Sequence, residues 1–114
     1  MEPPTHLRLL PWLSAEGKPC FLAPADKGGY LSALADETES LQMDAGTEAL
    51  VCARRVLDNP CVPNVEVRYA AIRLAECLGD ILRVAESRGH RLAASAAAAA
   101  AEDDDPVEDA ADAC

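Results

Sequence analysis

The stretch VEVRYAAIRLAECLGDILRVAESR, residues 65–88, decides the fold expected for this chain. Its apolar residues recur at alternating steps of four and three, which is the spacing of one stripe along an α-helix. This stripe consists of Val67, Ala71, Leu74, Leu78, Ile81 and Ala85. A second apolar flank consists of Val65, Ile72, Ala75 and Leu82. We therefore expect a helix over residues 65–88 that ends at Gly89, because glycine commonly terminates helices.

The residues before this stretch predict a second long helix. Its expected apolar stripe consists of Leu31, Leu34, Thr38, Leu41, Ala45, Ala49, Cys52 and Val56. The carboxylates at positions 36, 37, 39, 44 and 48 fall mostly off this stripe, which predicts a charged face in solvent. Gly46 costs about 1 kcal/mol against alanine and predicts a bend. We expect one helix of about 27 residues, ending at Asn59 before Pro60, and the short connector then favours an antiparallel helical hairpin.

The N-terminal residues predict a small β-hairpin. Residues 6–12 and the segment PCFLA read as short strands on either side of a turn at Gly17. Two strands alone are marginal in water, so this hairpin has to pack on the helices. The expected fold class is therefore mainly α, of the α+β kind, with a β-hairpin on an antiparallel two-helix hairpin.

The C-terminal residues differ in composition from the rest. The formal net charge is −10, and the acidic segment that begins at Glu102 contains no basic residue. Alanine and one serine make up residues 93–101, for which we expect disorder or a frayed helix. We thus expect a domain over residues 1–92 and a disordered alanine-rich, acidic tail over residues 93–114. The acidic balance argues against nucleic acid as a partner, because such binding requires exposed Lys and Arg.

The five cysteines indicate reduced thiols and a cytoplasmic location, since the first residues do not have the pattern of a secretory signal. No apolar run is long enough to predict a membrane span. There is no C-x-x-C pair, and His6 and His90 lie far apart in the sequence, so we expect no metal site. No cofactor motif is present either.

A thiol-dependent enzyme or redox protein is the alternative that the sequence leaves open. It would use Cys20 near the turn at Gly28 and Gly29, with His6 as the base. No residue is placed to orient that histidine, and a flexible turn beside a buried thiol is the expectation for this stretch. Catalysis is therefore not the leading hypothesis.

The segments LRLLPW (7–12), EGKPCFL (16–22), GGYLS (28–32) and LRVAESRG (82–89) carry a resemblance to known proteins. Over residues 6–92 the chain resembles a group of short actinobacterial proteins found near helix-turn-helix regulators and anti-sigma-type ATPases. The group has no known chemistry, so the resemblance implies no catalytic residues. It implies a bacterial cytoplasmic protein in a regulatory setting.

The leading hypothesis is a non-enzymatic protein–protein interaction module that forms a homodimer and binds a protein partner of unknown identity. A helical hairpin buries one stripe of each helix, and the 65–88 stretch carries more apolar residues than one stripe needs. An exposed apolar surface of this kind typically marks an interface. The β-hairpin, with Trp12 and Phe21, is the competing cover. The candidate interface residues are Leu41, Val56, Leu74, Leu78, Ile81 and Leu82.

Overall fold

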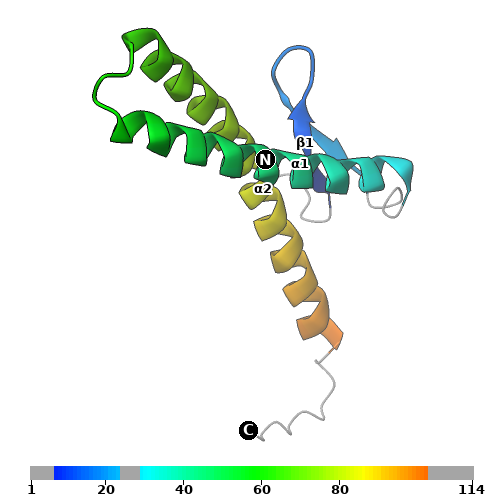
Figure 1. Ribbon diagram of the computed structural model, residues 1–114. Helices are drawn as coiled ribbons and strands as arrows, with labels where there is room; N and C mark the ends of the chain where they lie inside the picture. The colour runs from blue at the N-terminus through cyan, green and yellow to red at the C-terminus, as the bar shows by residue number, and fades with distance from the viewer. Residues whose placement is uncertain (1–6, 24–28, 103–114) are drawn as a thin grey trace, which may run out of the picture.

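The computed structural model describes residues 7–23 and 29–102 of the 114-residue chain. Two strands precede two long helices, as Figure 1 shows. The elements are β1 (Arg8–Leu13), β2 (Pro19–Leu22), α1 (Tyr30–Asp58) and α2 (Asn64–Glu102). The structure thus confirms a mainly helical fold with an N-terminal antiparallel two-stranded sheet.

The β-hairpin pairs Arg8 with Leu22 and Leu9 with Phe21. Its register is irregular between Leu9 and Leu13, the interval that contains Pro11, which has no N–H to donate to the ladder. The turn is the expected one: Gly17 has a φ of 82°, which glycine adopts without a steric cost.

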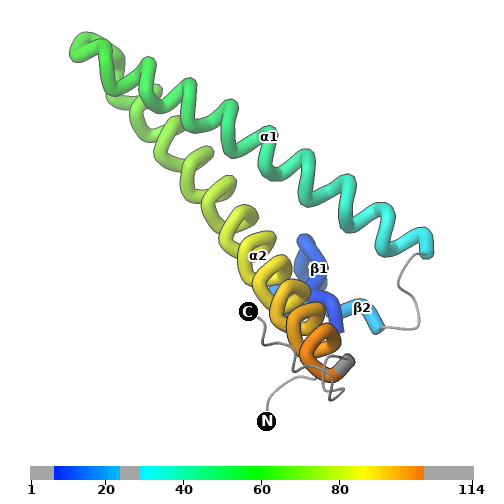
Figure 2. The backbone as a smooth tube through the Cα atoms, turned by 90° about the horizontal axis from the view of Figure 1, so that it is seen from below, coloured from blue at the N-terminus to red at the C-terminus, as the bar shows by residue number. Residues whose placement is uncertain are grey.

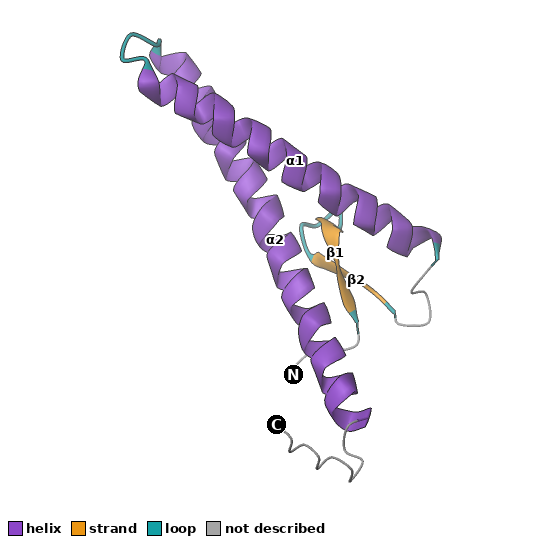
Figure 3. Ribbon diagram, turned by 60° about the horizontal axis from the view of Figure 1, so that its bottom comes forward, coloured by secondary structure: helices purple, strands orange, loops and turns teal. Residues whose placement is uncertain are grey.

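The two helices form an open V, and the β-hairpin lies between its arms (Figures 2 and 3). α1 and α2 lie side by side near the connector at residues 59–63 and diverge toward the other end. The radius of gyration is 19.9 Å, whereas a compact domain of this length has about 13 Å. The molecule is therefore elongated, with much of its surface far from any common core.

α1 buries a different face from the expected one. Its fully buried residues are Ala35, Glu39, Ala49 and Ala53, whereas Leu31, Leu34 and Leu41 are exposed. Small side chains suit this inner face because the neighbouring elements approach closely. At Gly46, a Cβ atom would collide with the end of the Ile81 side chain. The expected stripe is therefore wrong over the first half of α1, while the expected helix end at Asn59 is confirmed.

α2 runs past Gly89 to Glu102, so the helix end expected at Gly89 is wrong. A terminating glycine usually takes a left-handed conformation, and among the described residues only Gly17 does so. The alanines that follow Gly89 have the highest helix propensity and continue the helix. The acidic residues 103–114 of the expected tail lie outside the described residues.

The core is small and lies at the open end of the V. Leu10 and Leu22 of the β-hairpin pack on Ala35 of α1, with Trp12 and Cys20 partly buried against them. On α2 the buried residues are Cys77, Val84 and Ser87, one step away from the expected stripe. None of the helices in the described part of the chain is apolar over a length that could cross a bilayer.

Candidate functional site

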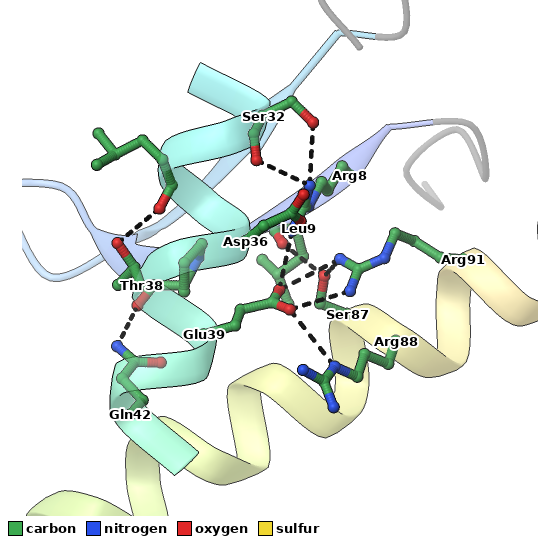
Figure 4. A network of polar contacts seen from close by, with 12 residues as sticks. Arg8, Leu9, Ser32, Asp36, Thr38, Glu39, Gln42, Ser87, Arg88 and Arg91 are labelled. Atoms are coloured by element: carbon green, nitrogen blue, oxygen red, sulfur yellow. Dashed lines mark hydrogen bonds and ion pairs between the residues drawn. The ribbon is translucent and has the colours of Figure 1, made fainter. Parts of the chain in front are cut away.

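The most deeply buried charge is Glu39 on α1, whose side chain lies where α1, α2 and β1 meet (Figure 4). Arg91 of α2 donates to both of its carboxylate oxygens, over 3.1 Å and 3.3 Å. Arg88 donates from Nε to Oε1 over 3.4 Å, and Arg8 of β1 donates to Oε2 over 3.2 Å. A carboxylate that is only 2 % exposed is thus surrounded by three guanidinium groups.

Arg8 and Ser87 extend this cluster into the β-hairpin. Arg8 is 5 % exposed and donates to Asp36 over 2.7 Å as well as to the hydroxyl of Ser32 over 3.2 Å. The Ser87 hydroxyl donates to the carbonyl of Leu9 over 2.6 Å and accepts a hydrogen bond from Arg91. These bonds hold β1 against both helices, and we call the group the polar latch. Its members are Arg8, Ser32, Asp36, Glu39, Ser87, Arg88 and Arg91.

The polar latch has the chemistry of a structural junction. Both oxygens of Glu39 are occupied, and guanidinium groups do not give up a proton at ordinary pH. No cluster of His, Cys, Asp and Glu suited to a metal ion occurs within residues 7–23 and 29–102. The arrangement holds α1, α2 and β1 together, and the buried carboxylate of Glu39 is fully paired.

Sequence reasoning placed Glu39 in solvent and missed the polar latch. A signal was nevertheless present, because small and polar residues share one face of α1 at alternating steps of four and three. This face consists of Ala35, Glu39, Gln42, Gly46, Ala49, Ala53 and Val56. The leucine stripe beside it is the more apolar pattern and therefore predicts a different buried face. The Gln42 amide also belongs to the buried side, since it donates to the Pro11 carbonyl over 2.9 Å.

At the closed end of the V, the two helices form an open groove of about 700 Å³. Its lining is largely small or apolar, with charged residues among it. The lining residues are Glu48, Ala49, Cys52, Val56, Val65, Glu66, Tyr69, Ala70 and Arg73. Arg73 donates to Glu76 over 2.9 Å, and this hydrogen bond raises the pKa of the guanidinium. Arg73 is therefore already paired, whereas Glu48 and Glu66 form no ion pair with any described residue.

The opposite side of the helical hairpin exposes a second apolar surface, which we call the back face. On α2 it is a stripe without any charged residue: Val67, Ala71, Leu74, Leu78, Leu82, Ala85, Gly89 and Leu92. Leu78 is 57 % exposed and Leu82 is 60 % exposed. On α1, Leu50 and Leu57 are exposed. They lie beside the inner face, on the side opposite to the groove residues Cys52 and Val56.

The six candidate interface residues do not share one surface. Leu74, Leu78 and Leu82 belong to the back face, and Ile81 lies between the helices against Gly46. Val56 lines the groove. Leu41 is 60 % exposed on α1 and lies in neither. Sequence periodicity thus identified the apolar stripe of α2 but not which surface each residue belongs to.

The cysteines are distributed over packing and surface positions. Cys20 is half-buried beside Leu10 and Leu22, and Cys77 is buried on α2. Cys52, which belongs to the expected apolar stripe of α1, is exposed in the groove. His90 is exposed on α2, while His6 and Gly28 lie outside the described residues. The structure therefore gives Cys20 an apolar environment.

Comparison with protein-family models, with curated proteins and with solved structures gives no match. The resemblance to the actinobacterial group stays a prediction.

Proposed function

We propose that this chain is a non-enzymatic protein–protein interaction module that forms a homodimer through its back face. The observation that carries the proposal is the exposure of Leu78 and Leu82 in the middle of an uncharged helical stripe. The β-hairpin was the competing cover for this stripe. It packs beside the stripe instead, where Ser87 bonds to Leu9 and where Leu82 borders a hollow shared with Leu9 and Phe21, and it leaves Leu78 and Leu82 mostly exposed.

A second copy is the occupant that the charge distribution favours. The formal net charge is −10, but seven of the acidic residues belong to the segment that begins at Glu102, so the rest of the chain is close to neutral. The back-face stripe of α2 has no charge from Val67 to Leu92, so two copies can meet there without burying like charges. A stripe whose apolar residues recur at steps of four and three can pack against the same stripe of a second copy, as an interface with two-fold symmetry requires.

The small core supports the same conclusion. Among the buried residues of the described part of the chain, the large branched aliphatic side chains are those of Leu9, Leu10, Leu22 and Val84. A chain of this length buries a modest fraction of its surface even when it is compact. Pairing two helical hairpins as a four-helix bundle would bury Leu50, Leu57 and the α2 stripe together.

The regulatory bacterial setting rests on the resemblance alone. The thiol-dependent alternative receives less support, because Cys20 packs among apolar side chains. Labelling with iodoacetamide near neutral pH separates the two: a single hyper-reactive thiol at Cys20 would favour the enzyme.

Sedimentation equilibrium at tens of micromolar tests the dimer. We expect a mass of twice the 12.0 kDa of one chain. Leu78→Asp should give the mass of one chain with helical circular dichroism retained, because Leu78 is exposed within each copy. Leu41→Asp is the matched control: Leu41 is equally exposed but lies off the back face, and this variant should stay dimeric. A single-chain mass for the unaltered protein would refute the proposal.

A further inference from the structure

We propose that the groove at the closed end of the V binds an amphipathic helical segment of another protein, with apolar anchors flanked by Lys or Arg. This goes beyond the homodimer by assigning the partner's chemistry and its binding surface. It rests on the proposed function in one respect, namely that the second copy occupies the back face and leaves the groove free.

The lining of the groove fits apolar anchors. Val56 of α1 and Val65 and Tyr69 of α2 face one space of about 700 Å³, with alanines at Ala49 and Ala70. Two helices that border an apolar groove form the usual seat for a third, amphipathic helix, whose side chains at i, i+3 or i+4 and i+7 enter it. Tyr69 is 64 % exposed, so it offers a large contact area that is uncovered in the single chain.

The charges of the groove select a basic partner. Glu48 stands on the α1 wall and Glu66 on the α2 wall, and within the described part of the chain neither is neutralised by an ion pair. The one lining cation, Arg73, is engaged by Glu76. A segment with Lys or Arg on both sides of its apolar anchors would complement these two walls.

The same charges exclude other occupants. A second copy would bring its own Glu48 and Glu66 against these residues if it docked groove to groove, which is unfavourable. The acidic segment of this chain that follows Glu102 would be repelled for the same reason. An anionic membrane surface is likewise disfavoured. A basic amphipathic segment remains as the complementary class.

The groove and the back face point in different directions. On α2 the groove residues Val65, Tyr69 and Arg73 alternate with the back-face residues Val67 and Ala71, so the two sets occupy opposite sides of the helix. A dimer formed through the back face therefore leaves two grooves open, one on each copy. The module would present two equivalent sites to basic segments.

The experiment selects displayed helical peptides of about four turns from a random library on the full chain. We expect enriched sequences to carry apolar residues at helical spacing with Lys or Arg on both sides. The best enriched peptide is then measured by fluorescence polarisation. Its affinity should fall at least about tenfold on Tyr69→Glu, which places a carboxylate at an exposed position in the groove.

Matched charge variants test the basic preference. Glu48→Gln with Glu66→Gln should weaken the same peptide and flatten the salt dependence of its binding. Glu37→Gln with Glu86→Gln removes as much charge away from the groove and should leave binding unchanged. Enrichment of peptides without basic flanks, or no loss on Tyr69→Glu, would overturn the inference.

Two further outcomes separate this inference from the dimer. If Tyr69→Glu reduces the mass to one chain, the groove is the dimer contact and the inference is wrong. If Leu78→Asp is monomeric and still binds the peptide, both proposals stand independently. If Leu78→Asp leaves the mass unchanged while Tyr69→Glu abolishes peptide binding, the back-face dimer fails and the groove assignment survives.

Discussion

The two ends of the V differ in which side chains they bury and which they expose. At the open end, the β-hairpin and both helices bury charged groups, with Glu39 between Arg8, Arg88 and Arg91. At the closed end, the helices pack through small residues such as Ala49 and Ala53. There, large apolar side chains such as Leu57 and Val65 remain in solvent. Charged groups are thus buried at the open end, and large apolar side chains are exposed at the closed end.

The difference separates two tasks within one short chain. Buried hydrogen bonds require exact geometry, so the open end specifies how the β-hairpin sits on the helices. Exposed apolar area gives little to the isolated chain and becomes stabilising only when another surface covers it. We infer that the buried contacts of the open end determine the fold of one copy, and we propose that the exposed apolar surfaces are where other molecules bind.

Of the changes considered, removing Glu39 should have the largest effect on the free energy of unfolding. Glu39→Ala should lower the free energy of unfolding by about 3–5 kcal/mol, because three guanidinium groups would lose their shared carboxylate. Urea unfolding measures the change. Glu37→Ala, an exposed neighbour on α1, should stay within about 0.5 kcal/mol. A loss for Glu39→Ala as small as that of the control would mean that the polar latch is dispensable.

Shortening one leucine at each end comes next. Leu22→Ala in the buried core should cost about 2–5 kcal/mol at every protein concentration. Leu78→Ala on the back face should instead lower the melting temperature only in concentrated samples, where the unaltered protein is dimeric and gains stability from dimerisation by mass action. Melting curves over a range of concentrations distinguish the two. If both variants lost the same stability at every protein concentration, the proposed difference between the two ends would be wrong.

A pair of glycines gives a smaller test. Gly89→Ala should stabilise the protein by about 1 kcal/mol, because Gly89 lies inside α2 with open space where a Cβ would be. Gly46→Ala should not gain this amount, since its Cβ collides with Ile81. Thermal unfolding compares them. Destabilisation by Gly89→Ala would contradict a helix that continues through this residue.

Truncation after Leu92 should have the smallest effect. The alanines over residues 93–101 are exposed apart from the half-buried Ala94, so they bury little area. We expect the free energy of unfolding to change by less than about 0.5 kcal/mol. Far-ultraviolet circular dichroism should show the lost helical residues. A drop of several degrees in the melting temperature would show that the C-terminal part packs against the rest.

Much of the architecture could be predicted from the sequence because it depends on local rules. The turn at Gly17, the end of α1 before Pro60 and the antiparallel hairpin each follow from a few adjacent residues. The end of α2 could not be predicted, because Gly89 can either terminate a helix or lie inside one. The choice depends on the helix propensity of the alanines beyond it.

The buried face of α1 was the harder problem. Periodicity marks every apolar stripe, but it does not say which stripe a neighbouring element covers. Leu34 and Leu41 form the more apolar stripe, yet Ala35 and Glu39 are buried. The decisive factor is the β-strand that brings Arg8 to Glu39 from 31 residues away, and the pattern of α1 alone does not show which element will cover which face.

The bond from the Ser87 hydroxyl to the Leu9 carbonyl joins residues 78 positions apart. Contacts of such long range form slowly, because the chain between them must first be ordered. The helices, by contrast, are joined by the short connector at residues 59–63 and can pair early. We expect the β-hairpin to dock late in folding, so that weakening the polar latch accelerates unfolding more than it slows folding.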